Sequence, residues 1–106
     1  MENGLDINVL KNVCSSGQIK WTTHTLERMQ ERNIEPSDVI SCIDNGQIIE
    51  QYPQAFPYPA CLILGKGINI SDIHVVLGFG NDMVFIVTVY EPDVNEWEND
   101  YSVRKG

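Results

Sequence analysis

The chain has few positively charged residues for its length of 106 residues. Lysine and arginine together number 7, against 15 aspartates and glutamates, and the formal net charge at pH 7 is −8. Binding of nucleic acid through bulk attraction depends on Lys and Arg facing phosphates. The overall charge therefore argues against tight, unaided binding of RNA. A small anion site depends on the local potential instead, so the net charge does not exclude RNA chemistry.

Cysteine is scarce, and no two cysteines are close in the sequence. The three are Cys14, Cys42 and Cys61, without a CxxC pair, and the chain has only two histidines. Zinc sites usually show paired ligands. We therefore expect free thiols in a reducing compartment, with no bound metal and no cofactor.

Long apolar runs and the common catalytic signatures are also lacking. The longest apolar run, residues 83–89, is too short to cross a bilayer, and no charged-then-apolar stretch opens the chain. We expect a cytoplasmic protein without a membrane partner. Gly65-Lys66-Gly67 does not have the spacing of a phosphate-binding loop, and the GxSxG and HExxH motifs are missing.

The remaining composition suits one folded domain over residues 1–106. Hydrophobic residues make up 42% of the chain, which argues against disorder. Helical signals come first and strand signals follow, without strand–helix–strand alternation. The expected fold class is α+β, with N-terminal helices packed on an antiparallel sheet of about four strands. Residues 91–106, with five acids and two bases, are expected to dock as an acidic tail that is irregular or helical.

Capping and turn residues set the expected boundaries of these elements. The elements are a first helix capped by Asn3 or Asp6, a short extended stretch at 19–21, a second helix from Thr22 or Thr23 to about Arg32, a third helix from about Pro36 to Asp44, and strands at 47–52, 61–64, 73–79 and 83–90.

One group of side chains reverses the sign of the charge locally. His24, Arg28 and Arg32 are spaced by four residues and therefore share one side of the expected second helix. Arginine offers a planar fork of donors suited to phosphate, and histidine changes charge near neutral pH. The spacing predicts an anion site suited to phosphodiester chemistry. Glu27 and Glu31 alternate with the arginines, so the alternative is a solvated helix face with weak ion pairs.

The second histidine, His74, lies near the start of an apolar strand. A lone histidine there is more often a hydrogen-bonded, partly buried group than a catalyst. A three-residue loop at 80–82 would place His74 opposite Thr88, with Tyr90 further along the same face. A two-residue loop would place it opposite Val89. A slip of one residue turns the side chain to the other face of the sheet, so the spacing leaves the register open.

Short motifs spread over about residues 18–105 carry a family resemblance. They are the run from Trp21 to Arg32 (WTTHTLERMQER), Asp38-Val39, Asn45-Gly46, Ile49-Glu50, Tyr52, Tyr58-Pro59, Cys61-Leu62, Gly65, His74-Val75-Val76, Thr88-Val89-Tyr90, Pro92 and the stretch from Trp97 to Arg104. Together they resemble the bacterial domain-of-unknown-function family 4258.

This resemblance implies the RelE-like, or barnase- and EndoU-like, fold of small metal-independent ribonucleases and mRNA-cleaving toxins. It implies the toxin half of a toxin–antitoxin-like pair, with RNA or the ribosome as target and a zinc-finger antitoxin-like protein as partner. The catalytic residues that it implies are His24, Arg28, Arg32, His74, Thr88 and Tyr90. The chain departs from active ribonucleases of this fold in being acidic, whereas they are usually basic.

Two functions are consistent with these features. The first is a metal-independent endoribonuclease, with the two histidines as acid and base and the two arginines on the phosphate. Thr88 or Tyr90 would orient groups by hydrogen bonding. The second is a non-catalytic module of the same fold, whose negative surface binds a basic partner protein.

Overall fold

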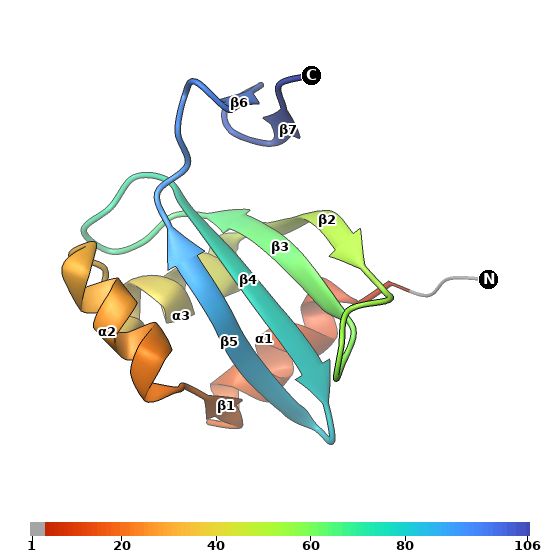
Figure 1. The fold of residues 1–106 in the computed structure, drawn as a ribbon. Coiled ribbons are helices and arrows are strands. Elements are labelled where there is room, and N and C mark those ends of the chain that lie inside the picture. The colour runs from red at the N-terminus through yellow and green to blue at the C-terminus, as the bar shows by residue number, and fades with distance from the viewer. Residues whose placement is uncertain (1–3) are drawn as a thin grey trace.

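The computed structural model describes residues 4–106 and confirms the α+β class (Figure 1). In chain order, the elements are α1 (Ile7–Ser15), β1 (Ile19–Lys20), α2 (Thr23–Glu31), α3 (Pro36–Asn45), β2 (Gln47–Tyr52), β3 (Ala60–Gly65), β4 (Ile73–Gly80), β5 (Met83–Tyr90), β6 (Trp97–Glu98) and β7 (Val103–Arg104).

The helices begin at the residues that the sequence indicates. The Asp6 carboxylate caps α1 by accepting a hydrogen bond of 2.8 Å from a first-turn N–H. The Thr22 hydroxyl does the same for α2 at 3.0 Å, and Pro36 opens α3. Asn3, the other candidate cap for α1, lies outside the described residues. Among residues 4–106, no helix is long and apolar enough to cross a membrane.

The main sheet has five strands in the order β1-β5-β4-β3-β2, and it is mixed. The expectation of about four antiparallel strands was therefore wrong in count and in direction, because β1 adds to the edge of β5 in parallel, with Ile19 opposite Val84. A two-residue strand is too short to show alternation in the sequence. Its pairing depends on α1, which packs on α3 and on β5 and so brings β1 to the sheet edge.

The β4–β5 hairpin has a register that differs from both alternatives offered by the sequence. The turn is the two-residue type, since Gly80 pairs with Met83. A bulge then shifts the pairing between Val76 and Leu77, so His74 lies opposite Tyr90 instead of Thr88 or Val89. The bulge leaves an unpaired stretch of β5 backbone. The buried Thr25 hydroxyl of α2 lies 3.4 and 3.3 Å from two carbonyl oxygens there, so α2 packs against the bulge.

The two faces of the sheet have different surroundings. One face packs against α1 and α3, as Figure 1 shows, and forms the core. We call the other side the open face. Its cross-strand rows, given by the register, are Leu64–His74–Tyr90, Glu50–Leu62–Val76–Thr88 and Tyr52–Ala60–Gly78–Phe85.

The C-terminal segment docks on the domain, and it is irregular, as expected, except for two short strands that the sequence did not predict. β6 and β7 pair antiparallel and form a small hairpin, residues 97–104, which Figure 1 places beyond the ends of the main strands. Trp97 is its buried residue. A pair of two-residue strands is again too short for its alternation to be visible in the sequence.

Candidate functional site

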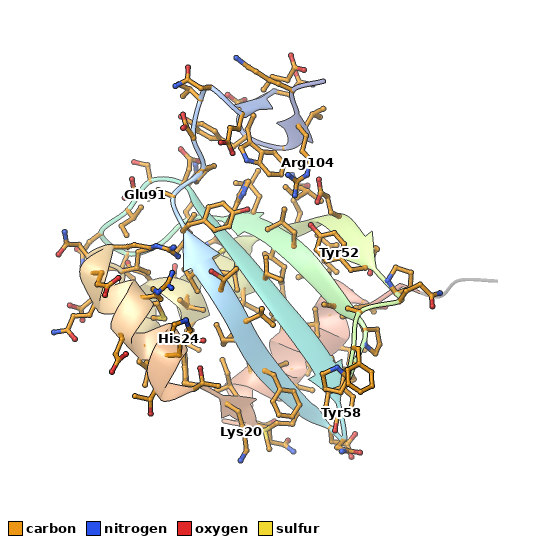
Figure 2. The ribbon with its side chains drawn as sticks, in the orientation of Figure 1. Lys20, His24, Tyr52, Tyr58, Glu91 and Arg104 are labelled. Carbon is orange, nitrogen blue, oxygen red and sulfur yellow. The ribbon has the colours of Figure 1, made fainter. Side chains whose placement is uncertain are left out.

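The cationic ridge, defined as His24, Arg28 and Arg32, lies along α2 beside β5. All three side chains are exposed. Arg32 Nη1 donates a hydrogen bond of 2.7 Å to the carbonyl oxygen of Val89 and lies 3.5 Å from Thr88 Oγ1. Figure 2 shows His24 on the side of α2 that is turned towards β5. The ridge therefore borders β5 instead of lying on the far side of the helix.

The position of the ridge follows from the residues that anchor α2. Thr25 and Met29, each one position after a ridge residue, are the buried residues of this helix. Successive positions of a helix are about 100° apart, so the ridge runs along the margin of the buried contact. The sequence spacing predicted the shared side, and the structure adds that this side lies next to the open face.

The alternating glutamates form no ion pair with the ridge within residues 4–106. Glu27 and Glu31 are exposed, and in the described part of the chain neither forms an ion pair with Arg28 or Arg32. Of the alternative, a solvated helix face with weak ion pairs, the described residues show the solvated face but not the ion pairs. The guanidinium of Arg28 faces solvent, where it can meet an anion.

His74 lies in the interior, beneath the C-terminal hairpin. Its exposed fraction is 0%, and its ring lies edge-on to Trp97 with 4.4 Å between ring centroids. The Nε2 atom is 2.9 Å from the carbonyl oxygen of Tyr101, and Nδ1 is 3.3 Å from the hydroxyl of Tyr90. Because a carbonyl only accepts, Nε2–H donates to it and Nδ1 of the neutral ring accepts from Tyr90.

Burial sets the protonation of this group. Loss of solvent lowers the pKa of His74, and the hydrogen bond to Tyr101 and the charge of Glu50 oppose that shift without reversing it. Burial also raises the pKa of Tyr90, so its hydroxyl keeps the proton that it donates. In this arrangement both ring nitrogens of His74 are occupied, and the imidazole is neutral.

Acidification below neutral pH is expected to loosen the hairpin. Folded His74 has a pKa below its ordinary value of about 6.5, so its contribution to stability is present above that pH and is lost as the pH falls towards the folded pKa. The charged or titratable groups that act on it are Glu50, Asp72, Tyr90 and Arg104. The lowered pKa of Glu50 acts in the same direction at more acidic pH.

Trp97 fluorescence in a Trp21→Phe background measures this loosening. The emission should shift to the red as the pH falls from 7 to 5. The His74→Gln variant should lose that step. An emission that is equally pH-dependent without His74 would contradict the assignment.

Glu50, Tyr52 and Arg104 form a polar cluster next to His74. Arg104 Nε and Nη2 donate to the Glu50 carboxylate at 2.8 and 3.2 Å, and Tyr52 donates to the same carboxylate. Partial burial raises the pKa of Glu50, but these hydrogen bonds outweigh burial, and the net direction is downward. The guanidinium also lies 4.7 Å from the centroid of the Trp97 ring. Sequence reasoning did not find this cluster, because its members are up to 54 positions apart.

An apolar groove occupies the other end of the open face. It has a volume of about 370 Å³ and is lined by residues of the 52–60 segment together with Val76, Gly78, Phe85 and Val87. The rings of Tyr58 and Phe85 stack with centroids 5.2 Å apart. Gly80 allows this, because a Cβ there would lie 2.1 Å from the Tyr58 ring. No charged residue lines the groove.

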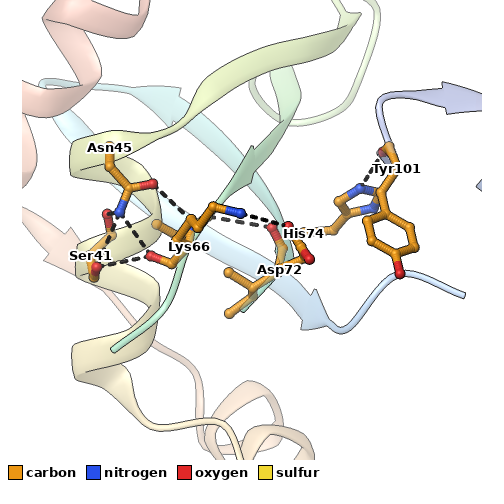
Figure 3. A network of polar contacts seen from close by, with 8 residues as sticks. Ser41, Asn45, Lys66, Asp72, His74 and Tyr101 are labelled. Carbon is orange, nitrogen blue, oxygen red and sulfur yellow. Dashed lines mark hydrogen bonds and ion pairs between the residues drawn. The ribbon is translucent and has the colours of Figure 1, made fainter. Parts of the chain in front are cut away.

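A network on the edge of α3 fixes the loop that leads into β4 (Figure 3). Asn45 Nδ2 donates to the carbonyl oxygens of Ser41 and Lys66 at 2.7 and 2.9 Å, and Lys66 N donates to Asn45 Oδ1 at 2.8 Å. The Lys66 ammonium forms an ion pair of 3.1 Å with Asp72. These contacts hold the 65–72 connection and so position His74, two residues later. Gly65-Lys66-Gly67 thus has a structural role.

The cysteines lie apart from the ridge and from the hairpin. All three are buried, and burial raises the pKa of Cys14 to about 11 and that of Cys42 and Cys61 to about 12. Protonated, buried thiols are poor nucleophiles. In the region from residue 4 to residue 106, no cluster of three or more His, Cys, Asp or Glu side chains could hold a metal ion.

The six predicted site residues fall into two groups. The cationic ridge reaches Thr88 through Arg32, while His74 contacts Tyr90. Thr88 and Tyr90 lie in neighbouring rows of the open face. Arg32 and Thr88 therefore border the end of that face where His74 and Tyr90 lie, and the hairpin covers the second group. His24 lies nearer the middle of β5, because its neighbour Thr25 contacts the carbonyl oxygens of Ile86 and Val87.

Comparison with known proteins identifies the family. The model described as "Domain of unknown function (DUF4258)" matches residues 21–91, more than half of the chain, and the chain belongs to this family. The match confirms the family resemblance over a narrower range than the motifs suggested. It includes all six predicted site residues and ends before the C-terminal hairpin. No curated protein and no solved structure matched the chain.

Proposed function

We propose that this protein is a metal-independent endoribonuclease, related to RelE-like toxins and acting as the toxin half of a toxin–antitoxin-like pair. The observation that supports the proposal most is the unpaired cationic ridge beside the open face of the sheet. An exposed imidazole and an exposed guanidinium there provide one proton-transfer group and one phosphate ligand. Arg28 and Arg32 supply the positive charges that a phosphate would meet on this otherwise acidic chain.

The reaction that suits these groups is transfer of the phosphate to the neighbouring ribose hydroxyl. A base removes the proton of the 2′-hydroxyl, and the 2′-oxygen attacks phosphorus while the bond to the 5′-oxygen breaks. An acid donates a proton to that leaving oxygen. The products are a 2′,3′-cyclic phosphate and a 5′-hydroxyl, and no other reactant is consumed.

The chain's residues take separate parts in this step. His24 exchanges a proton with one of the two oxygens, and Arg28 neutralises the phosphate oxygens, whose charge grows in the transition state. Arg32 is tied to β5 by its hydrogen bond to Val89, so it contributes a fixed positive charge next to Thr88. The Thr88 hydroxyl can orient the phosphate by hydrogen bonding.

The experiment that tests the proposal is RNA cleavage by the purified protein. The substrates are a labelled single-stranded RNA of mixed sequence and a messenger RNA on translating ribosomes, because the acidic chain is expected to need help in holding RNA. Wild-type protein that cleaves neither substrate, and that does not arrest growth on expression, would rule the proposal out.

A second function, binding of a partner protein without catalysis, is favoured by the apolar groove. Phe56 at its rim is 95% exposed and Val87 is 55% exposed. Exposed apolar side chains gathered on one surface often mark a protein interface. A basic partner with an apolar anchor residue would fit, because the groove is uncharged while the rest of the chain is acidic.

The Phe56→Ala variant tests the second function. Its affinity for the zinc-finger antitoxin-like partner that the family resemblance implies, measured by titration calorimetry, should fall at least about tenfold, as for an interface hot spot. Ile68→Ala is the matched control, because Ile68 is also exposed, at 65%, but lies outside the groove. Equal affinities of the two variants would contradict a partner site in the groove.

A further inference from the structure

The C-terminal hairpin covers one end of the open face. Trp97 is the buried side chain through which it packs there. Trp97 is 4% exposed and lies over His74, which has no exposed surface. β6 and β7 pair only with each other and add no strand to the main sheet. Apart from Trp97, every residue of β6 and β7 is exposed. The attachment is therefore local and small.

Two further attachments are the hydrogen bond of 2.9 Å from His74 Nε2 to the Tyr101 carbonyl oxygen and an ion pair at the surface. Arg104 holds Glu50, and its side chain is 60% exposed while that of Glu50 is 22% exposed. Exposed ion pairs contribute little to stability and are weakened by salt. This contact orients the hairpin, and salt is expected to weaken it.

The backbone of the hairpin turn is strained where it meets His74. Asn99, Asp100 and Tyr101 have φ angles of 55°, 57° and 72°, three successive non-glycine residues in the left-handed region. Each such residue is disfavoured, and Tyr101 more than the other two, because asparagine and aspartate tolerate this region better. The Tyr101 carbonyl is the one that His74 donates to. The closed position is thus kept by few contacts, one of which is made by a residue with a disfavoured backbone conformation.

The charge of the segment is the reverse of what RNA binding needs. Between residues 93 and 106 the acidic residues are Asp93, Glu96, Glu98 and Asp100, all exposed. They lie on the covering segment, so phosphates approaching this end of the face would be repelled while the segment is in place.

We infer that residues 93–106 are a reversible, autoinhibitory cover, and that His74 enters the reaction only when the cover lifts. This rests on the proposed ribonuclease function. Opening breaks the Nε2–H bond to Tyr101 and removes Trp97 from the ring, so the imidazole becomes accessible to solvent and to substrate. His74 then supplies the second proton-transfer group, beside Thr88 and the cationic ridge.

Trp97→Ala tests the cover, with Val94→Ala as control. Val94 is 57% exposed and belongs to the same segment, so its loss leaves the docking intact. A second pair is Arg104→Ala with Lys105→Ala, since each removes one cation from the hairpin. If Trp97→Ala does not fold, the Arg104→Ala and Lys105→Ala variants still test the cover.

Two readouts are needed. The first is the rate at which a histidine-acylating reagent modifies His74, followed by mass spectrometry of the His74 peptide. It should rise at least about tenfold in Trp97→Ala, because a tenfold change in the opening equilibrium needs only a small loss of contact energy. The second is the cleavage rate, which should rise several-fold in Trp97→Ala and in Arg104→Ala and stay at the wild-type value in the controls.

The outcomes separate the cover from the proposed function. A Trp97→Ala protein in which His74 is exposed, but which cleaves RNA no faster than the wild type, would overturn the cover. His74 that is no more reactive in a folded Trp97→Ala protein would overturn it as well. Wild-type protein that cleaves no RNA, free or on ribosomes, and does not arrest growth on expression would overturn the ribonuclease, and the autoinhibition with it.

Discussion

Replacing His24 with alanine is expected to lower RNA cleavage about 10²–10⁴-fold, the usual contribution of a positioned proton-transfer group. Stability should change by less than about 0.5 kcal/mol, because the side chain is exposed and alanine is the best helix former. The loss should therefore appear in the rate constant of cleavage and not in the thermal midpoint of unfolding.

Glu27→Ala is the matched control for this prediction. Glu27 is exposed on the same helix and has no place in the proposed reaction, and its removal makes the surface less negative. Its cleavage rate should equal or exceed that of the wild type. A His24→Ala protein that cleaves as fast as Glu27→Ala would remove His24 from the mechanism.

The second large effect is expected from Asp38→Ala, which should lower the free energy of unfolding of the domain that carries the site. Asp38 is fully buried, and its carboxylate accepts hydrogen bonds from the N–H groups of Glu35, Ile68 and Asn69 at 3.0, 2.7 and 2.9 Å. Removing it leaves three N–H groups without their partner, at a cost of roughly 3 kcal/mol or more. That is a large fraction of the stability of a small domain.

The charge state of Asp38 gives this prediction a pH signature. Burial raises the pKa of Asp38, but the three backbone hydrogen bonds outweigh it, and the net direction is downward. Its contribution to stability is therefore present above the unfolded pKa of about 3.9 and is lost as the pH falls through the folded value.

Denaturant unfolding at pH 7 and at acidic pH measures both effects. Asp44→Ala on the same helix is the control, because Asp44 is exposed near the C-terminal end of α3. Equal unfolding free energies for Asp38→Ala and Asp44→Ala at pH 7 would contradict the account of the buried carboxylate.

Much of the fold could be predicted because capping and turn residues mark where its elements begin and end. Pro36 and Asn45-Gly46 bracket α3 within the sequence itself, and the apolar run after the turn gives β5 its bounds of Met83–Tyr90. Signals of this kind need only neighbouring residues. β1 could not be predicted, because its two residues become a strand only when α1 brings them to β5.

Of the candidate site, the ridge on α2 could be predicted because it depends on local spacing. The surroundings of His74 could not. A spacing of four residues suffices to place His24, Arg28 and Arg32 on one side of α2. The position of His74 depends on a bulge in β5 and on Trp97, 23 residues further along the chain. Contacts of that range leave no periodic trace in the sequence, so neither the neutral, buried state of His74 nor the Glu50–Arg104 pair could be derived from it.

The chemical ends of the RNA fragments test the ribonuclease most directly. The purified wild-type protein is incubated with a labelled RNA, free and on ribosomes, and the fragments are analysed by mass spectrometry. We predict a 2′,3′-cyclic phosphate on the upstream fragment and a 5′-hydroxyl on the downstream one. Fragments with a 5′-phosphate, or RNA that stays intact under both conditions, would contradict the mechanism proposed for this face of the protein.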